Sequence, residues 1–252
     1  MTETAGVKGT LFLWTDRWML LGRLPANRAH RHVSASLLLG LDGSFDLDVD
    51  GERRRTRAAA VAPDVMQALD PGTTTMLVAQ LDPDSDAWRR LASRLDGRAS
   101  VDIDLPETIA RALVASDDCG AVAEGLTHLL SATSPLPLDE RVVQVCQHLR
   151  ETLPDRLDVA DLAARVELSA SRLTHLFSEQ TGVTLRRFLL YLKITRAVSR
   201  WEPGMTLSSL AAEAGFYDQP HLVRTARDMF DALPSVYIST GQFRICRCAD
   251  TP

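Results

Sequence analysis

Two groups of mostly polar side chains stand at matching positions near the end of this 252-residue chain. Each group follows a residue, Ser169 or Asp218, whose side-chain oxygen can accept a hydrogen bond from the unpaired amides that begin a helix. Side chains on the outer face of such a helix can bond to base edges in the major groove of DNA. This spacing therefore points to nucleic-acid recognition. The candidate residues are Ser171, Arg172, Thr174 and His175 in the first group and Gln219, Pro220, Val223 and Arg224 in the second.

A short pattern that occurs twice must position these two groups. Residues 162–169 read LAARVELS and residues 210–218 read LAAEAGFYD, so the second copy has one more residue in its turn. A short helix, a tight turn and a second amphipathic helix make a helix-turn-helix, and two copies predict contact with DNA at two places. The alternative is a plain helical bundle in which the repeat only packs. The apolar residues that follow each turn fall on one helical face: Leu173, Leu176 and Phe177, then Leu222 and Ala226.

A longer helix is predicted between the two copies. Thr184 could cap a helix that begins at residue 185 and runs at least to residue 198, ahead of Pro203 and Gly204. At about 1.5 Å per residue, a helix of this length would span about 25 Å. It could therefore hold two recognition helices about one turn of DNA, ~34 Å, apart.

Residues 138–237 resemble the DNA-binding domain of the AraC/XylS transcription regulators. The resemblance rests on LSASRLTHLF at 168–177, GVT at 182–184, AGFYDQPHL at 214–222 and PSVY at 234–237. It implies a sequence-specific regulator that reads double-stranded promoter DNA with two recognition helices, and that contacts RNA polymerase if it activates transcription. By position, the family's base contacts correspond to Ser171, Thr174, His175, Gln219, Pro220, Val223 and Arg224. Arg172 lies on the same outer face, and we expect Arg187 to contact phosphate.

The second motif departs from the family pattern more than the first. Leu222 and Ala226 stand where the family usually has aromatic residues, and Asp228 stands where a basic residue is expected. Asp231 replaces a frequent glycine, and Ile238 replaces a frequent basic residue. We therefore expect the first motif to carry more of the direct base recognition.

Charge is distributed unevenly along the chain. The formal net charge is −5. Residues 1–136 hold 14 Lys and Arg against 19 Asp and Glu, whereas residues 137–252 hold 14 of each. DNA contact must then depend on local basic clusters, and non-specific affinity should be low. The clusters that we expect to contribute contain Arg186, Arg187, Lys193 and Arg196.

The four cysteines do not form a zinc-binding pattern. Cys119 and Cys146 are isolated, while Cys246 and Cys248 flank Arg247 in the C-terminal tail. We expect a cytoplasmic protein, because no apolar stretch is long enough to span a membrane and the N-terminus lacks a signal sequence. The cytosol would keep the cysteines reduced. The tail pair could bind a soft metal or sense oxidation, although an incidental tail is the simpler interpretation.

The first 80 residues predict an antiparallel β structure. Six short apolar runs, at 11–14, 18–21, 37–41, 45–49, 58–62 and 75–81, are separated by turn signals. Asp42-Gly43 and Asp50-Gly51 are hairpin markers, and residues 45–49 alternate with a period of two. Residues 29–63 weakly resemble the small cupin barrel that often precedes this type of DNA-binding domain.

His30 and His32 are the candidate ligands of this barrel. They would face the same side of a strand, as two metal ligands should. A cupin metal site also needs a carboxylate soon afterwards and a distant histidine, and the distant position holds Gln67. We therefore expect no bound metal and no cofactor. His30, His32 and Gln67 could instead line a polar pocket for a small effector, or be merely structural.

Residues 84–133 turn helical, and these helices could pair two subunits into a homodimer or simply pack against the barrel. A proline-marked linker follows, at 131–137. We therefore expect an α+β protein of two domains: a cupin-like barrel at 1–83, helices at 84–133, and a helical DNA-binding domain at 137–245. One alternative is a metal-dependent cupin-type enzyme with an accessory helical domain. Another is a regulator whose N-terminal half only dimerises and binds no ligand.

Overall fold

The computed structural model of this chain describes residues 8–116, 118–202, 204–231 and 243–249. Its internal contacts divide the chain into two compact units, which are described separately below. Unit 1 comprises residues 1–136 together with residues 234–252. Unit 2 comprises residues 137–233. The PSVY segment at 234–237 and Ile238, which entered the family resemblance, lie outside the described residues.

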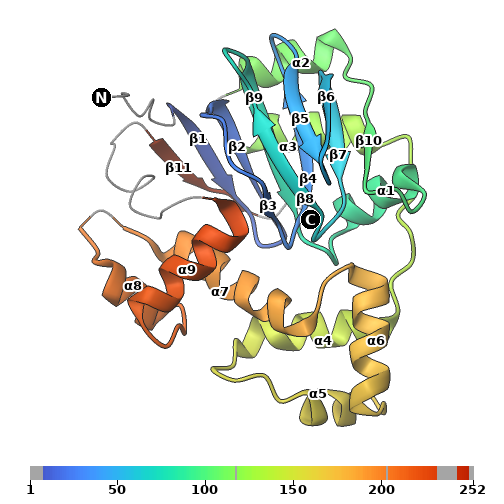
Figure 1. Ribbon diagram of the computed structural model, residues 1–252, viewed down its shortest axis with the longest axis vertical. Helices are drawn as coiled ribbons and strands as arrows, with labels where there is room; N and C mark the ends of the chain where they lie inside the picture. Colours follow the sequence, from blue (N-terminus) through green and yellow to red (C-terminus); the bar gives the residue numbers. More distant parts are fainter. Residues whose placement is uncertain (1–7, 117, 203, 232–242, 250–252) are drawn as a thin grey trace. The chain divides into compact units, whose positions relative to one another are not determined.

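Unit 1 contains two β-sheets in its described residues (Figure 1). One is a seven-stranded sheet in the order β10-β7-β4-β9-β2-β1-β11, and the other is a four-stranded sheet in the order β3-β8-β5-β6. The strands of the larger sheet are β1 (Lys8–Leu13), β2 (Arg17–Arg23), β4 (Ala35–Gly40), β7 (Ala58–Val61), β9 (Thr75–Leu81), β10 (Ser100–Asp102) and β11 (Phe243–Arg247). Those of the smaller sheet are β3 (His30–Arg31), β5 (Phe45–Val49), β6 (Glu52–Thr56) and β8 (Met66–Asp70).

The six predicted apolar runs all form strands, and one of the two predicted hairpins is present. Asp50 and Gly51 have φ angles of 52° and 88° and connect β5 to β6, where Val49 pairs with Glu52. A two-residue loop with positive φ at both positions matches the twist of the strands that it joins. The Asp42-Gly43 prediction is wrong, because β4 and β5 belong to different sheets. Asp42 instead accepts hydrogen bonds from the backbone amide and hydroxyl of Thr75, both at 2.7 Å.

The predicted cupin-like barrel is not confirmed, because the described strands of unit 1 form two separate sheets. Within the described residues the ladders end at β10 and β11 in one sheet and at β3 and β6 in the other. The predicted apolar runs do not include β3, β6, β8, β10 or β11. The β6 sequence ERRRT shows why: four of its five side chains are exposed or half-buried, so no apolar run marks the strand.

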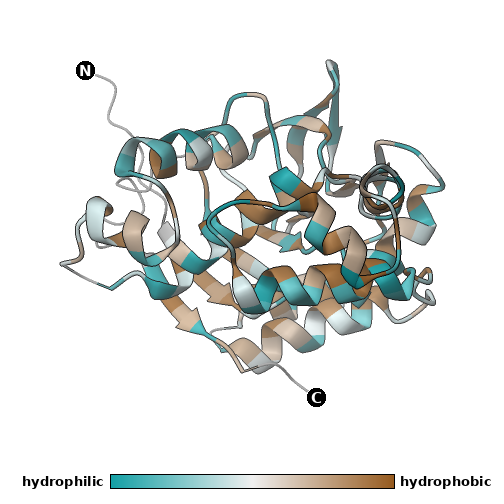
Figure 2. Cartoon of the chain, turned by 90° about the horizontal axis from the view of Figure 1, so that it is seen from below, coloured by the Kyte–Doolittle hydropathy of each residue, from teal (hydrophilic) through white to brown (hydrophobic). Residues whose placement is uncertain are grey.

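Three helices are described within residues 84–133, the segment that the sequence predicts to be helical. They are α1 (Asp86–Leu95), α2 (Glu107–Val114) and α3 (Cys119–Leu130). Their apolar sides join one core with the larger sheet, in which Trp88, Leu91 and Leu113 pack with Phe12 and Leu37. Hydrophilic and hydrophobic stretches alternate along the helices in Figure 2, as amphipathic helices require.

The linker is bonded to α1. The backbone amide of Leu136 donates to the carbonyl oxygen of Arg89 at 3.0 Å, and Nε of Arg89 donates to the carbonyl oxygen of Leu136 at 3.0 Å. Nη1 of Arg90 also donates to the carbonyl oxygen of Thr133 at 2.6 Å. Arg89 is buried, and this burial lowers its pKa. Ordered contacts therefore hold the chain where it leaves unit 1.

The tail returns to unit 1, which corrects two expectations. β11 pairs in parallel with β1, so residues 243–245 belong to the N-terminal sheet and not to the helical domain. Cys248, just after β11, forms a disulfide with Cys119 at the start of α3. The expectation of four reduced cysteines therefore fails for this pair. The sequence could not indicate the pairing, because it depends on a strand contact between the two ends of the chain.

Unit 2 is built from helices in its described residues. They are α4 (Glu140–Thr152), α5 (Val159–Arg165), α6 (Ala170–Thr181), α7 (Leu185–Arg200), α8 (Leu207–Glu213) and α9 (Gln219–Phe230). The predicted cap Thr184 accepts a hydrogen bond from the amide of Arg187 and begins α7. α7 spans 16 residues, or about 24 Å. It contacts α6 of the first motif and both α8 and α9 of the second.

Candidate nucleic-acid interface

The first motif consists of α5, a turn and α6. Asp158 begins α5 by accepting hydrogen bonds from the amides of Ala160 and Asp161. The chain reverses at Glu167, whose φ is 56°, and the amide of Leu168 donates to the carbonyl oxygen of Ala163 at 2.9 Å. Ser169 then caps α6, as predicted, by accepting from the amide of Arg172 at 3.2 Å.

The second motif repeats this geometry. Gly215, with a φ of 74°, takes the place of Glu167, and the amide of Phe216 donates to the carbonyl oxygen of Ala211 at 2.9 Å. Asp218 caps α9 by accepting from the amide of His221 at 2.7 Å. Two segments with the same turn hydrogen bond, the same reversal and the same type of cap are two copies of one helix-turn-helix, as the sequence predicts.

The extra residue of the second turn is Tyr217. Leu168 is followed directly by the cap Ser169, whereas Tyr217 lies between Phe216 and the cap Asp218. Phe216 is buried and its ring meets that of His221 edge to face at 5.2 Å. Tyr217 is 94% exposed. The insertion therefore places a large aromatic side chain in solvent, immediately before the recognition helix.

The apolar residues of both recognition helices are buried, as predicted. Leu173, Leu176 and Phe177 face inward from α6. Leu222 and Ala226 face inward from α9, so the smaller residues that depart from the family pattern still occupy core positions. The ring of Phe177 meets that of Phe188 on α7 at 5.5 Å, which fixes α6 to the long helix.

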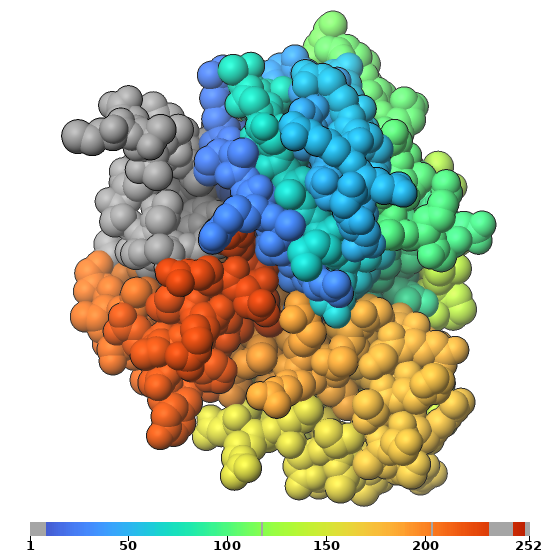
Figure 3. All heavy atoms as spheres, in the orientation of Figure 1, coloured from blue at the N-terminus to red at the C-terminus, as the bar shows by residue number. Residues whose placement is uncertain are grey.

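The predicted base-reading residues lie on the outer faces of these helices. Side chains of α6 and α9 reach the surface in Figure 3. Of the predicted base-reading residues, Val223 is half-buried. The others are exposed: Ser171, Arg172, Thr174, His175, Gln219, Pro220 and Arg224. The structure thus brings each group together on one helix and joins both helices to α7. Their contact with bases stays a prediction.

Two of these residues also have contacts inside the protein. The hydroxyl of Thr174 donates to the carbonyl oxygen of Ala170 at 2.8 Å, which leaves its oxygen able to accept. Nε2 of His175 lies 3.9 Å from a carboxylate oxygen of Glu179, one turn later on α6. Both side chains of that pair are largely exposed, so water screens the interaction and His175 can exchange it for a base.

The basic cluster predicted on α7 divides into exposed and engaged residues. Arg186 and Arg196 are exposed. Arg187, expected to contact phosphate, is half-buried, and its Nη1 donates to a carboxylate oxygen of Asp228 on α9 at 3.5 Å. Asp228, which replaces the basic residue that the family pattern predicts, therefore serves to join α9 to α7. A phosphate would have to compete with this carboxylate for Arg187.

Lys193 was wrongly expected to contribute to the basic surface. It is buried, and its Nζ donates to the carbonyl oxygens of Gly215 at 2.6 Å and Asp155 at 3.2 Å. Burial lowers the pKa of Lys193, and the Asp155 carboxylate partly offsets this effect. The side chain ties α7 to the second turn. Helical periodicity could have placed Lys193 on the inner face, because Leu189 and Ala197 are four residues away on either side.

The effector-site candidates of unit 1 meet between its two sheets. His30 pairs with Gln67 in the register of β3 and β8, and His32 faces the same side, with its Nε2 2.8 Å from Nε2 of His30. Nδ1 of His30 lies 2.7 Å from the carbonyl oxygen of Arg28, which can only accept, so this nitrogen carries the hydrogen. Nε2 of His30 and Nε2 of His32 share one hydrogen bond.

The sequence missed the polar residues that continue this cluster. Nε2 of Gln67 and Nε2 of Gln80 both donate to the hydroxyl of Ser36, at 2.7 and 2.8 Å. Ser34 donates to Oε1 of Gln80 at 2.6 Å. Ser36 lies on β4 and Gln80 on β9, and both strands are otherwise mostly apolar. A polar residue at an inward-facing position of an apolar strand is the signal that could have identified each of them.

The chemistry of this buried cluster does not suit a divalent metal. It contains amides and hydroxyls that bond to one another, beside two imidazoles. Among the residues that the structure describes, no group of three or more His, Cys, Asp or Glu side chains could hold a metal ion. Burial lowers the pKa of His32 well below its usual value, and the nearby His30 lowers it further. His32 is therefore neutral at pH 7.

Comparisons with known proteins agree with the helix-turn-helix assignment. A helix-turn-helix domain family matches residues 162–240. The arabinose operon regulatory protein of Escherichia coli is 32% identical over 103 residues, which are 40% of this chain and 35% of that protein. The uncharacterized HTH-type transcriptional regulator YbfI of Bacillus subtilis is 31% identical over 88 residues, or 35% of this chain and 32% of that protein. The match therefore spans about a third of the length of these relatives.

Solved structures of ToxT from Vibrio cholerae share the fold over most of this chain. An apo ToxT variant superposes with a TM-score of 0.64 at 11% identity and covers 88% of this chain and 98% of its own. ToxT with an unsaturated fatty acid bound gives a TM-score of 0.59 at 11% identity, covering 94% of this chain and 96% of its own. Among the helices described for this chain, none combines the length and apolar character needed to cross a membrane.

Proposed function

We propose that this chain is a transcription regulator of the AraC/XylS type, which binds promoter DNA at specific sites through both recognition helices; the helix-turn-helix match at residues 162–240 and the similarity to the arabinose operon regulatory protein support this proposal. The observation that carries this proposal is the duplicated turn. Both motifs share one backbone hydrogen bond and one type of cap, and both present an outer face of exposed side chains. Ser171, Arg172, Thr174 and His175 would read one major-groove segment, and Gln219, Pro220, Val223 and Arg224 the next.

The scaffold suits two simultaneous contacts. α7 contacts both motifs and is about 24 Å long, which is of the order of the ~34 Å between successive major-groove segments. Arg186 and Arg196 are exposed on it and could meet phosphates. The second half of the chain carries no excess positive charge, so specificity must come more from base contacts than from general attraction to DNA.

Unit 1 would supply the signal that controls DNA binding. Its fold is shared with ToxT, and one ToxT structure holds an unsaturated fatty acid. We propose a small organic effector near His30, His32 and Gln67 between the two sheets, where a ligand would exchange hydrogen bonds with the polar cluster.

Helices α1 to α3 would pair two subunits. RNA polymerase would be a further partner if the protein activates, and the cytoplasm would be its location.

The rival interpretation is a metal-dependent cupin-type enzyme with an accessory helical domain. The relatives named above are regulators of transcription, and the polar cluster of unit 1 lacks a set of metal ligands among the described residues. Both observations favour regulation over catalysis. A further alternative, in which unit 1 only dimerises, differs from the proposal in having no effector.

A genome-wide map of bound DNA, made with the full-length chain, tests the proposal. The expected result is a small set of promoter sites that share one motif of two separated segments. The matched control is the variant Arg165→Ala, which removes an exposed arginine from α5, outside both recognition helices, and should keep the same motif. Binding without any shared motif would contradict the proposal.

A further inference from the structure

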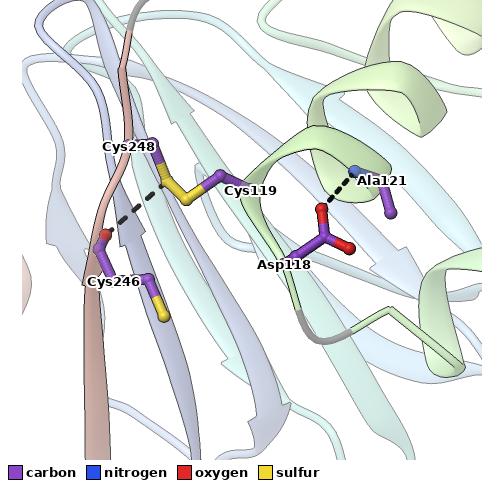
Figure 4. Close-up of a disulfide and its surroundings, with 5 residues drawn as sticks. All are labelled: Asp118, Cys119, Ala121, Cys246 and Cys248. Carbon is purple, nitrogen blue, oxygen red and sulfur yellow. Dashed lines mark hydrogen bonds between the residues drawn. A yellow bond between two sulfur atoms is a disulfide. The ribbon is translucent and has the colours of Figure 1, made fainter.

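The described chain ends in a strand that is attached to unit 1 in two ways. β11 pairs with β1 from Gly9–Phe243 to Leu13–Arg247, and the amide of Cys248 donates to the carbonyl oxygen of Leu13 at 2.8 Å. Cys248 is also bonded to Cys119, with their Cα atoms 5.7 Å apart (Figure 4). The chain between these two cysteines contains all of unit 2. The disulfide therefore closes a covalent loop of chain that contains unit 2.

Without the disulfide, only the pairing with β1 and side-chain packing would hold this strand. β11 is an edge strand of five residues among the described strands, and parallel pairing is slightly less stable per residue than antiparallel pairing. Arg244 and Arg247 are exposed, whereas Ile245 and Cys246 are half-buried. Short edge strands of this kind open at a lower cost in free energy than core strands. The covalent bond therefore adds a restraint that the pairing alone does not supply.

The surroundings of the two sulfurs suit reversible chemistry. Cys119 is the first residue of α3, a helix of 12 residues, and the preceding Asp118 carboxylate caps the first turn by accepting from the amide of Ala121. Cys119 and Cys248 are each only partly buried and pack at the edge of the core, so a small reagent can approach them. Cys246 lies two residues before Cys248 on the same face of the strand and remains a free thiol.

We propose that Cys119 and Cys248 form a thiol–disulfide exchange site, oxidised by low-molecular-weight disulfides, that attaches β11 to the sheet of unit 1. In the oxidised state the segment that contains β11 is joined covalently to the start of α3. In the reduced state β11 is held to the sheet only by non-covalent contacts. The site thereby sets whether β11 can leave the sheet of unit 1, and it does so whether or not the proposed DNA function is correct.

The reaction balances without a metal or an enzyme. The thiolate of Cys248 attacks one sulfur of a disulfide RSSR, which forms a mixed disulfide and releases one RS⁻. The thiolate of Cys119 then attacks the Cys248 sulfur, which forms the Cys119–Cys248 bond and releases the second RS⁻. The two cysteines lose two electrons, RSSR gains them, and the two protons pass to the released thiolates. Excess thiol reverses both steps. In a reducing cytosol the bond would form only under oxidative conditions.

The test uses the full-length protein equilibrated with oxidised or reduced glutathione. Peptide mapping by mass spectrometry should find the Cys119–Cys248 crosslink only in the oxidised sample. Amide hydrogen exchange of residues 243–247 should become about tenfold faster or more on reduction. Cys246→Ser, a matched substitution in the same strand, should behave as the wild type. Cys248→Ser should exchange fast in both samples.

The comparison of the two wild-type samples needs no substitution, so a variant that fails to fold does not affect it. Absence of the Cys119–Cys248 crosslink after treatment with oxidised glutathione would overturn the proposal. Equal exchange rates of residues 243–247 in the oxidised and reduced samples would also overturn it, because the bond would then not control the strand.

Discussion

Nζ of Lys193 donates a hydrogen bond of 2.6 Å to the carbonyl oxygen of Gly215, so the long helix α7 is bonded directly to the turn of the second motif. The same ammonium group reaches the carbonyl oxygen of Asp155 in the loop before the first motif. One buried cation therefore connects the turn of the second motif with the loop that precedes the first motif. Its role is structural, although a lysine between two helix-turn-helix motifs would be expected to contact DNA.

Lys193→Met should destabilise unit 2 by about 1–3 kcal/mol, because two backbone carbonyl groups lose their donor. Chemical denaturation followed through Trp201, the unit 2 tryptophan, measures this change. Arg196→Met provides the control, since Arg196 is exposed on the same helix and should change the free energy of unfolding by less than about 0.5 kcal/mol. Equal effects of the two substitutions would refute the structural role of Lys193.

Unit 1 should lose stability as the pH falls below about 6.5, the usual pKa of histidine. Burial lowers the pKa of His32 in the folded chain, so the unfolded chain binds a proton that the folded chain does not. Stability is therefore complete above the unfolded pKa and decreases until the pH reaches the lower folded pKa. The slope should approach about 1.4 kcal/mol per pH unit for this one group.

Tryptophan fluorescence in a Trp201→Phe background measures this slope, because the remaining tryptophans lie in unit 1. His32→Gln should flatten the dependence of unfolding free energy on pH, even if it lowers stability at pH 7. His128→Gln, which alters a largely exposed histidine of the same unit, should leave the slope unchanged. A slope that survives His32→Gln would mean that another group causes it.

Tyr217 should contribute to DNA affinity without contributing to stability. Its side chain is 94% exposed beside the start of α9, and tyrosine hydroxyls are common donors to phosphate. Tyr217→Ala should weaken binding by about 1 kcal/mol, or roughly fivefold, at an unchanged melting temperature. Tyr217→Phe should show the same loss if the hydroxyl makes the contact. Unchanged affinity in both variants would exclude Tyr217 from the interface.

The parts of the fold that the sequence predicted are those with local signals. β5 alternates with a period of two and ends at Asp50-Gly51, and each recognition helix follows its cap and its apolar spacing. The mispredicted features depend on distant partners. Asp42-Gly43 has the composition of a hairpin turn, but Asp42 bonds to Thr75, and its two flanking strands pair elsewhere.

The candidate sites divide in the same way. Residues 171–175 and 219–224 could be assigned to outer faces because helical periodicity separates them from the core. That Arg187 bonds to Asp228 and Lys193 to Gly215 could not be predicted, since both contacts join segments more than twenty residues apart. The disulfide of Cys119 escaped prediction for the same reason, because it requires β11 to cross back to β1.

The central claim is that both recognition helices read DNA bases. Selection of bound sequences from a random DNA library tests it most directly. The full-length wild type, His175→Ala and Arg224→Ala are compared at one salt concentration. Each variant should lose preference at one or two base pairs, in different segments of the motif, and should weaken specific binding by about 1–3 kcal/mol. Arg165→Ala, with its arginine outside both recognition helices, should select the wild-type motif. If neither His175→Ala nor Arg224→Ala changes the selected motif, the two helices do not read DNA as described.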